Sequence, residues 1–270
     1  MSEPLYFSRA KLKTGRGDAL APLAAALLAG SKGQTIAQAH RIVWMLFNGG
    51  GDDRAIVDAE GKNRLFLWRE KTPGEYYILS RKAPCNSHGL FDLDTQAFAP
   101  SLGRGDVLRF SLRANPVVTR KMITDAKQKF DGKGRPRGKR CDIVMDALYP
   151  FAGEKGPRDD EGRSERARER EKRTAEAARD WLEGQGGKAG FALVRKPAPE
   201  DGVFLSASNY ETVFIPRLKG TVRTDSAKFG VLDFEGLIEV TDPALFLAKL
   251  GDGFGKAKAF GCGLMLIRRA

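Results

Sequence analysis

The chain has 270 residues, and 41% of them are hydrophobic. This apolar content can offset the entropy lost on folding, so we expect a globular fold with one large domain or two small ones. Lys and Arg outnumber Asp and Glu by 46 to 34, and the formal net charge of +12 favours a polyanionic partner. No apolar run reaches the roughly 18–20 residues of a membrane span, and the N-terminus lacks the pattern of a signal peptide. We therefore expect a cytoplasmic protein.

The cysteine pattern argues against disulfide and zinc sites. Cys85, Cys141 and Cys262 are widely spaced and odd in number, and the sequence has no CxxC motif. Cys85 and His88 would make only half of a zinc site. No cluster of Asp and Glu suggests a two-metal centre. We expect neither a metal nor a cofactor.

The first half of the chain alternates short apolar runs with two helical patterns. We expect strands at residues 5–12, 63–69, 75–80 and 95–99 and helices at residues 19–29 and 35–47. Thr35 can cap the second helix, along which apolar residues recur at a spacing of three to four up to Phe47. This order matches the strand–helix–strand–strand–helix–strand plan of a ferredoxin-like unit, except that no second helix is evident between Ser80 and Thr95.

The second half of the chain follows a similar order. We expect strands at residues 107–114, 190–195, 211–216, 220–223, 231–240 and 264–267 and helices at residues 163–183 and 243–250. The packed seam of the long helix should comprise Ala167, Glu171, Thr174, Ala178 and Trp181. The glycine-rich residues 184–187 should end that helix, and Asp242 with Pro243 is typical of a helix start. The sequence thus predicts an α+β protein with two tandem ferredoxin-like (RRM-like) domains, residues 1–103 and 104–270.

His40 is one of two histidines, and it lies on the helix expected at residues 35–47, one turn from Ile36 and Trp44. An imidazole can move a proton near neutral pH, because its unperturbed pKa is about 6.5. Cleavage of RNA by its own 2′-hydroxyl needs such a group as base or acid, and a cation nearby, for which Arg41 is the candidate. The alternative is a histidine at the edge of the core, bonded to a backbone carbonyl.

Three further segments could contact phosphates. Residues 132–140 carry five positive charges and no negative one, and Gly and Pro keep this run from being helical. Arg109 and Arg113 fall on one face of the strand expected at residues 107–114. Residues 251–263 contain five glycines and two lysines, so their backbone amides could approach phosphates closely. The structural alternatives are a solvated loop, a strand with exposed arginines, and a turn between a helix and a strand.

In this order, these segments resemble the CasE family of CRISPR-associated endoribonucleases. Residues 39–47 (AHRIVWMLF) are similar to the catalytic-histidine helix of that family, and residues 110–116 (FSLRANP) to its Arg-Ala-Asn-Pro motif. Residues 139–141 (KRC) fall where the family has a basic element. Residues 253–263 resemble its C-terminal glycine-rich loop, within which AKAFGCGL at residues 257–264 is the most specific match. The likeness spans nearly the whole chain.

The resemblance implies two ferredoxin-like domains and metal-independent cleavage of CRISPR precursor RNA at the base of the repeat hairpin. The products would carry 2′,3′-cyclic phosphate and 5′-OH ends, and the enzyme would keep the mature crRNA and join the other Cascade subunits. His40 would be the catalytic acid or base. Some members have a tyrosine one turn before this histidine, where this chain has Ala37. Residues 18–33 and 151–176 resemble insertions, and the second could add a protein contact.

RNA stems are recognised by shape and through their phosphates, so basic residues of the second half are candidates for RNA binding. They are Arg113, Arg135, Arg137, Lys139, Arg140, Arg217, Lys219, Arg223, Lys256 and Lys258. The loop glycines that would shape the RNA site are Gly253, Gly255, Gly261 and Gly263. Two other interpretations stay open, a non-catalytic protein that binds RNA hairpins and a ribonucleoprotein assembly protein with a basic surface.

Overall fold

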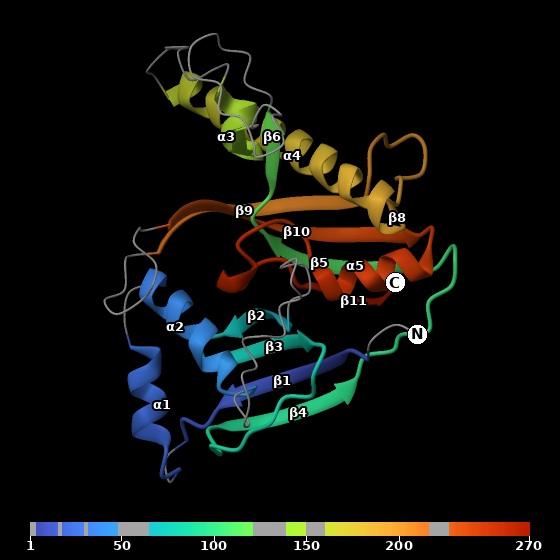
Figure 1. The fold of residues 1–270 in the computed structure, drawn as a ribbon. Helices are drawn as coiled ribbons and strands as arrows, with labels where there is room; N and C mark the ends of the chain where they lie inside the picture. The colour runs from blue at the N-terminus through green and yellow to red at the C-terminus, as the bar shows by residue number, and fades with distance from the viewer. Residues whose placement is uncertain are drawn as a thin grey trace, which may run out of the picture.

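Two antiparallel β-sheets, each covered by helices, form the core of the protein in a computed structural model (Figure 1). The structure describes residues 4–15, 18–29, 32–47, 65–120, 139–149, 160–215 and 227–270. The N-terminal part of the chain builds one sheet and the C-terminal part builds the other. None of the helices in these described ranges is long and apolar enough to cross a membrane.

The N-terminal sheet has the ferredoxin-like strand order. Its elements are β1 (Tyr6–Leu12), α1 (Ala21–Leu28), α2 (Lys32–Trp44), β2 (Phe66–Thr72), β3 (Glu75–Ser80) and β4 (Phe91–Ala97). The strands lie in the order β2-β3-β1-β4, and each neighbouring pair is antiparallel. Residues 81–90, between β3 and β4, form turns and no helix, as the sequence predicted. The apolar face of α2 packs on this sheet with the other buried side chains of the N-terminal core.

The C-terminal part of the chain repeats the same plan with additions, among them a separate two-stranded sheet of β6 and β7. Its elements are β5 (Val107–Ala114), β6 (Val117–Arg120), β7 (Lys139–Asp142), α3 (Ile143–Leu148), α4 (Asp160–Ala189), β8 (Phe191–Leu193), β9 (Leu205–Ile215), β10 (Ala227–Val240), α5 (Pro243–Asp252), the 3-10 helix η3 (Lys258–Phe260) and β11 (Met265–Arg269). The strands lie in the order β11-β5-β10-β8, and β9 pairs with β10 as well. Because β11, β5, β10 and β9 follow the ferredoxin-like order, the α+β class with two such units is confirmed. The boundary proposed near residue 103 lies between β4 and β5 and stays a prediction.

The long helix α4 does not end at residues 184–187, which corrects the sequence prediction. It continues to Ala189, because Leu182 and Ala189 are buried in the C-terminal core. Gly186 favours this packing, since a Cβ there would lie 2.6 Å from the carbonyl oxygen of Phe191. Gly190 follows the last helical residue, and its φ of +72° is costly for other residues.

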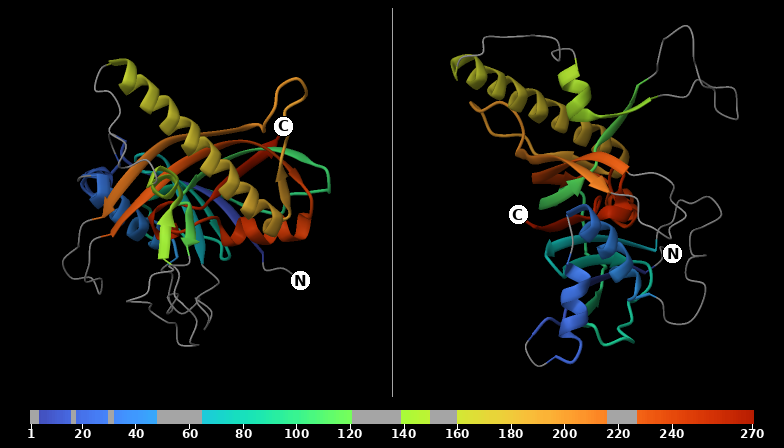
Figure 2. Two further views of the ribbon diagram at one scale, coloured as in Figure 1. Left: turned by 90° about the horizontal axis from the view of Figure 1, so that it is seen from above. Right: turned by 90° about the vertical axis from the view of Figure 1, so that its left-hand side faces the viewer.

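Only the C-terminal half of the predicted seam of α4 is packed. Ala178 and Trp181 are buried, whereas Ala167 and Glu171 are exposed. Figure 2 shows the N-terminal end of α4 projecting past the strands that its other end covers. The first turns of α4 therefore offer a surface beyond the core.

Several other bounds differ from prediction because tertiary pairing sets them. α2 begins at Lys32, so Thr35 lies inside the helix and is not its N-cap. β9 begins at Leu205 and not at residue 211, since it pairs along β10. The short elements β6, β7 and α3 were not predicted, and the strand expected at residues 220–223 lies outside the described residues. Asp242 does cap α5, accepting a hydrogen bond from the backbone N–H of Leu245 at 3.0 Å.

Apolar contacts join the two sheets around α2. Leu67 and Leu79 of the N-terminal sheet are buried against Leu264, which precedes β11. The N-terminal turns of α2 pack on the C-terminal sheet, where Ala37 and Ile215 share one buried cluster. The helix that carries His40 therefore contacts both ferredoxin-like units.

Candidate active site

His40 lies on α2 against a wall of aromatic side chains. Its ring centroid is 5.7 Å from that of Phe66 and 6.5 Å from that of Trp68, and the planes of the His40 and Trp68 rings differ by 26°. Phe66 and Trp68 are buried side chains of β2, whereas His40 is half-buried. The packed face of α2 thus fixes the histidine at the edge of the N-terminal core, as its spacing predicted.

Trp44 binds the imidazole of His40 directly. The indole N–H of Trp44 donates to Nε2 of His40 at 3.0 Å, from a position one helical turn further along α2. Nε2 can accept this bond only when it carries no proton, so the contact favours the neutral imidazole protonated at Nδ1. The sequence places Trp44 one turn from His40, but only the fold aims its N–H at the ring.

The glycine-rich loop also contacts Trp68. A Cβ at Gly261 would lie 3.3 Å from the six-membered ring of Trp68, so glycine favours this close approach of the backbone. Gly261 and Ala257 flank η3 and both have positive φ, at 76° and 53°. Phe260 of η3 stacks on Phe229 of β10 with ring centroids 5.5 Å apart. Trp68 therefore contacts both the loop and His40.

The Arg-Ala-Asn-Pro segment holds this loop through its backbone. The N–H of Gly263 donates to the carbonyl of Arg113 at 2.7 Å, and the N–H of Lys256 donates to the carbonyl of Asn115 at 3.0 Å. Asn115 is itself buried and donates from Nδ2 to the carbonyl of Gly230 at 2.7 Å. A Cβ at Gly255 would lie 2.6 Å from the Asn115 carbonyl oxygen. Sequence reasoning considered phosphate contacts for this motif and missed its role in bracing the loop.

Arg113 is bound by two carboxylates of the chain itself. It lies opposite Asp233 in the register of β5 and β10, and its Nη1 donates to both oxygens of Asp233 at 3.0 and 3.1 Å. Its Nη2 donates to Glu211 of β9. Burial alone lowers the pKa of Arg113, but the two carboxylates outweigh burial and raise it. Arg113 therefore joins three strands, and its predicted contact with RNA stays a prediction.

Replacing Arg113 with Met removes both ion pairs and keeps much of the apolar stem. We expect the free energy of unfolding to fall by about 2 kcal/mol, because two partly buried carboxylates lose their cation. The control is Arg109→Met on the exposed face of the same strand, which should change stability by less than about 0.5 kcal/mol. Urea denaturation of both variants measures the difference. If R113M unfolds like R109M and instead loses affinity for RNA, Arg113 contacts phosphate and is not a structural cross-link.

The remaining predicted basic residues differ in exposure and in whether the structure describes them. Arg41 on α2, Arg140 on β7 and Lys256 in the loop are exposed, whereas Lys258 donates to the carbonyl of Asp252 at the end of α5. Lys139 lies on β7. The basic residues that lie outside the described part of the chain are Arg135, Arg137, Arg217, Lys219 and Arg223.

The loop glycines are placed as the sequence predicted, in one turn region between α5 and β11. Gly253, Gly255, Gly261 and Gly263 all have positive φ. A Cβ at Gly263 would lie 2.6 Å from the carbonyl oxygen of Phe254, so the loop closes on itself. Ala37 is buried one turn before His40 against Val213 and Ile215, and its methyl group cannot transfer a proton.

Comparison with known proteins agrees with this architecture. The family described as CRISPR associated protein matches residues 5–269, and no curated protein matches the chain. The CRISPR endoribonuclease Cse3 bound to a 19-nucleotide RNA aligns over 99% of this chain and 100% of its own, with a TM-score of 0.60 and 22% identity. Cse3 of Thermus thermophilus, bound to an RNA representing a pre-cleavage complex, aligns over 98% and 99% with a TM-score of 0.57 and 22% identity.

A chain of a CRISPR RNA-guided surveillance complex also shares the fold. It aligns over 98% of this chain and 100% of its own, with a TM-score of 0.52 and 16% identity. The family match covers nearly every residue, including the histidine helix, the Arg-Ala-Asn-Pro segment and the glycine-rich loop. The chain belongs to the family of CRISPR-associated proteins.

Proposed function

We propose that this protein is a metal-independent endoribonuclease that cuts CRISPR precursor RNA at the base of the repeat hairpin and stays bound to the mature crRNA in Cascade. The observation that supports this most is the placement of His40, held by Trp44 and stacked on Trp68 beside the glycine-rich loop. The fold of this chain is similar to that of Cse3 bound to RNA and to that of a chain in a CRISPR RNA-guided surveillance complex. Family membership adds the CRISPR context.

The proposed reaction needs two proton transfers. The 2′-hydroxyl beside the scissile phosphate loses a proton and attacks phosphorus, the P–O5′ bond breaks, and the 5′-oxygen gains a proton. The products are a 2′,3′-cyclic phosphate and a 5′-OH. His40 makes one of these transfers as base or acid. Arg41, exposed at the next position of α2, stabilises the negative charge that develops on the phosphate.

His40 must change its hydrogen bonding when RNA binds. Nε2 accepts the indole N–H of Trp44, and Nδ1 is buried. The imidazole therefore exchanges the Trp44 bond for a bond to the substrate, and catalytic hydrogen bonds often form only in the substrate complex. Trp44 acts as a positioning residue that holds the neutral ring until then.

Replacing Trp44 with Phe removes the indole donor and keeps an aromatic ring in the same place. The neutral form of the imidazole then loses a hydrogen bond that stabilised it relative to the charged form. This bond is worth roughly 0.5–1.5 kcal/mol, which corresponds to about one pH unit. We expect the His40-dependent limb of the pH profile of cleavage to move to higher pH by up to about one unit. Single-turnover rates across pH measure this shift. A profile identical to wild type would mean that the indole does not control protonation of His40.

RNA binding is assigned to the exposed basic residues near this site and in the second half of the chain. Arg140 and Lys256 are the described candidates, and the basic residues at 135, 137, 217, 219 and 223 are further candidates outside the described part of the chain. The strand β9, which leads into residues 217–223, ends at Ile215, and Ile215 packs in one cluster with Ala37 of α2. Phosphate contacts by these residues make affinity fall steeply with salt.

Cleavage of a labelled repeat hairpin in EDTA tests the proposed function. We expect the wild-type protein to cut the hairpin once, at its base, at the same rate with EDTA as with Mg²⁺. A linear RNA of the same composition is the control and should survive. Tight binding without cutting would mean a non-catalytic hairpin-binding protein, and equal binding of both RNAs would mean an assembly protein with a general basic surface.

A further inference from the structure

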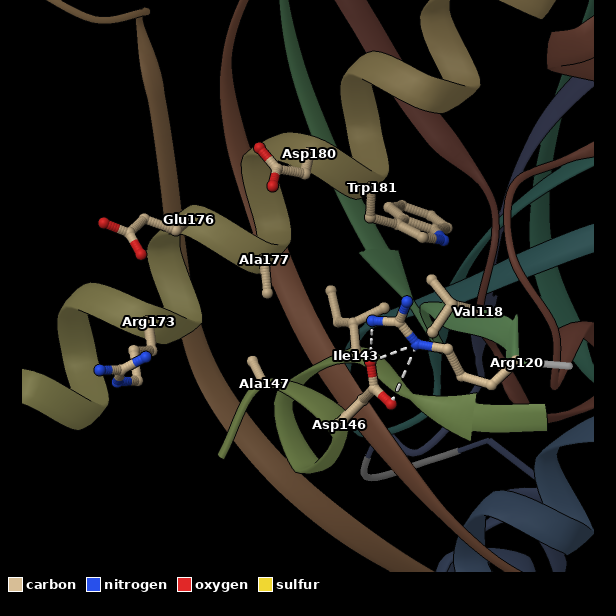
Figure 3. Close-up of a pocket in the computed structure, with 10 residues that line it drawn as sticks. All are labelled: Val118, Arg120, Ile143, Asp146, Ala147, Arg173, Glu176, Ala177, Asp180 and Trp181. Carbon is tan, nitrogen blue, oxygen red and sulfur yellow. Dashed lines mark hydrogen bonds and ion pairs between the residues drawn. The ribbon is translucent and has the colours of Figure 1, made fainter. Parts of the chain in front are cut away.

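A groove lies between β6, α3 and α4, in the part of the chain that the proposed chemistry does not use (Figure 3). Its volume is about 500 Å³. The apolar side chains that line it are Val118, Ile143, Ala147, Ala177 and Trp181. Figure 1 shows α3 and α4 on the opposite side of the C-terminal sheet from α2. The groove is therefore separate from His40 and the glycine-rich loop.

The cations of the groove are held by carboxylates of the chain. Arg120 donates from Nε and Nη2 to Oδ2 of Asp146, at 3.0 and 2.6 Å. Arg173 pairs with Glu169 one turn away on α4, at 2.5 Å. A bidentate pair such as that of Arg120 leaves little of the guanidinium for another anion. Both arginines that line the groove thus have a carboxylate partner within the chain.

Two further carboxylates border the same opening. Glu176 and Asp180 are exposed on α4, one turn apart, and the ion pair of Asp180 is a 3.5 Å contact with its neighbour Arg179. Like charges at this spacing destabilise a helix by a few tenths of a kcal/mol. With Asp146 they give the groove three carboxylates against two arginines, so its rim is slightly acidic in a protein whose net charge is +12. The two exposed carboxylates can pair with Lys or Arg side chains of a partner.

Two exposed apolar side chains lie on α3 and at its C-terminal end, outside the lining of the groove. Met145 is 58% exposed and Tyr149 is 80% exposed. Met and Tyr are enriched in protein–protein interfaces, where large apolar side chains become buried. An apolar floor with an acidic rim fits a protein segment that carries aliphatic or aromatic side chains flanked by Lys or Arg.

We propose that this groove docks a basic, amphipathic segment of another protein subunit of the same ribonucleoprotein. An apolar side chain of that segment enters the groove above Ala177 and Ile143, and its cations pair with Glu176 and Asp180. The identity of the partner as a subunit of that assembly rests on the proposed function, whereas its chemistry follows from the groove. The proposed RNA-binding residues Lys139 and Arg140 lie on β7, which pairs with β6 at the edge of the groove, so the crRNA and the protein neighbour bind close to each other.

A binding experiment with charge-reversed variants tests this assignment. The probe is the purified assembly of the other surveillance-complex subunits with an RNA that lacks the repeat hairpin, so that RNA cannot bridge the partners. We expect E176K/D180K to bind this probe about tenfold or more weakly than wild type, since two charge pairs become repulsive. Ala177→Trp, which fills the floor without changing charge, should weaken binding similarly. The matched control is E165K/E171K, with the same charge change on exposed positions of α4 outside the groove.

Hairpin cleavage separates this test from the proposed function. All variants should cut the hairpin like wild type, which also shows that they fold. If wild type does not cut but binds the probe in a groove-dependent way, the cleavage proposal fails and the docking proposal stands. Equal binding by wild type, E176K/D180K and A177W overturns the docking proposal. No binding of wild type to the probe, or an equal loss in E165K/E171K, overturns it as well.

Discussion

His40→Ala will bind the repeat hairpin as tightly as wild type but cut it about 10²–10⁴-fold more slowly. General acid–base catalysis by one side chain contributes roughly 10²–10⁴-fold, and Ala37 offers no second group one turn away. His40→Gln is the sharper variant, because its amide oxygen can accept the Trp44 indole N–H while it cannot transfer a proton near neutral pH. Single-turnover cleavage with excess protein measures both.

The other histidine provides the matched control for this prediction. His88 is exposed in the connection between β3 and β4, and His88→Ala should bind and cut like wild type. If His40→Gln cuts at the wild-type rate, the imidazole is a structural element of the aromatic wall, and the proton-transfer groups lie elsewhere. If His40→Ala loses hairpin affinity together with rate, the result reports binding and not chemistry.

Gly255→Ala will reduce the cleavage rate by about 10²-fold while the protein stays folded. Its φ of +69° disfavours any side chain, and a Cβ would lie 2.6 Å from the carbonyl oxygen of Asn115. The loop must then move from the Arg-Ala-Asn-Pro segment, and its contact with Trp68 moves with it. A displacement of about 1 Å at a reacting group can cost about 10²-fold in rate. Cleavage rates and circular dichroism spectra of the variant test both halves of this expectation.

Gly89→Ala is the control that separates the effect of backbone strain from that of the clash with the Asn115 carbonyl oxygen. Its φ of +67° is almost the same, but a Cβ added there would meet no other atom within 4 Å. Gly89→Ala should therefore lose about 1–2 kcal/mol of stability through strain and keep the wild-type rate. Equal rate losses in both variants would mean that general destabilisation, and not the position of the loop, limits cleavage.

Local signals in the sequence predicted the elements whose formation they control. β3 and β5 have the predicted bounds, because turn residues frame one and alternating side chains mark the other. α5 starts at Pro243 after its Asp242 cap, as such a pair requires. The ferredoxin-like class followed from the order of these elements, which does not depend on exact bounds.

Elements that depend on distant contacts were predicted less well. The glycines at 184–187 indicate a helix end locally, but burial of Leu182 and Ala189 carries α4 through them. β6 and β7 are four residues each and exist through their mutual pairing. Packing free energy from distant residues outweighs the propensity of about 1 kcal/mol that a glycine costs in a helix.

The sequence predicted the types and positions of the site residues, but it did not predict the hydrogen bonds and ion pairs that connect them. The sequence placed His40 at the edge of the apolar stripe and the glycines in one loop, and both positions agree with the structure. The carboxylate partners of Arg113 come from β9 and β10, about 100 residues away, so only the register of the sheet reveals them. The bond from Trp44 to His40 depends likewise on how Phe66 and Trp68 orient the two rings.

The most direct measurement of the central claim compares two repeat hairpins in EDTA, one all-ribose and one with a single 2′-deoxy sugar just before the scissile phosphate. If the 2′-oxygen is the nucleophile and no metal takes part, the wild-type protein will cut the ribose hairpin and leave a 2′,3′-cyclic phosphate and a 5′-OH. It will bind the deoxy hairpin equally well and leave it intact. Cleavage of the deoxy hairpin at the same rate, or loss of all cleavage in EDTA, would contradict the account.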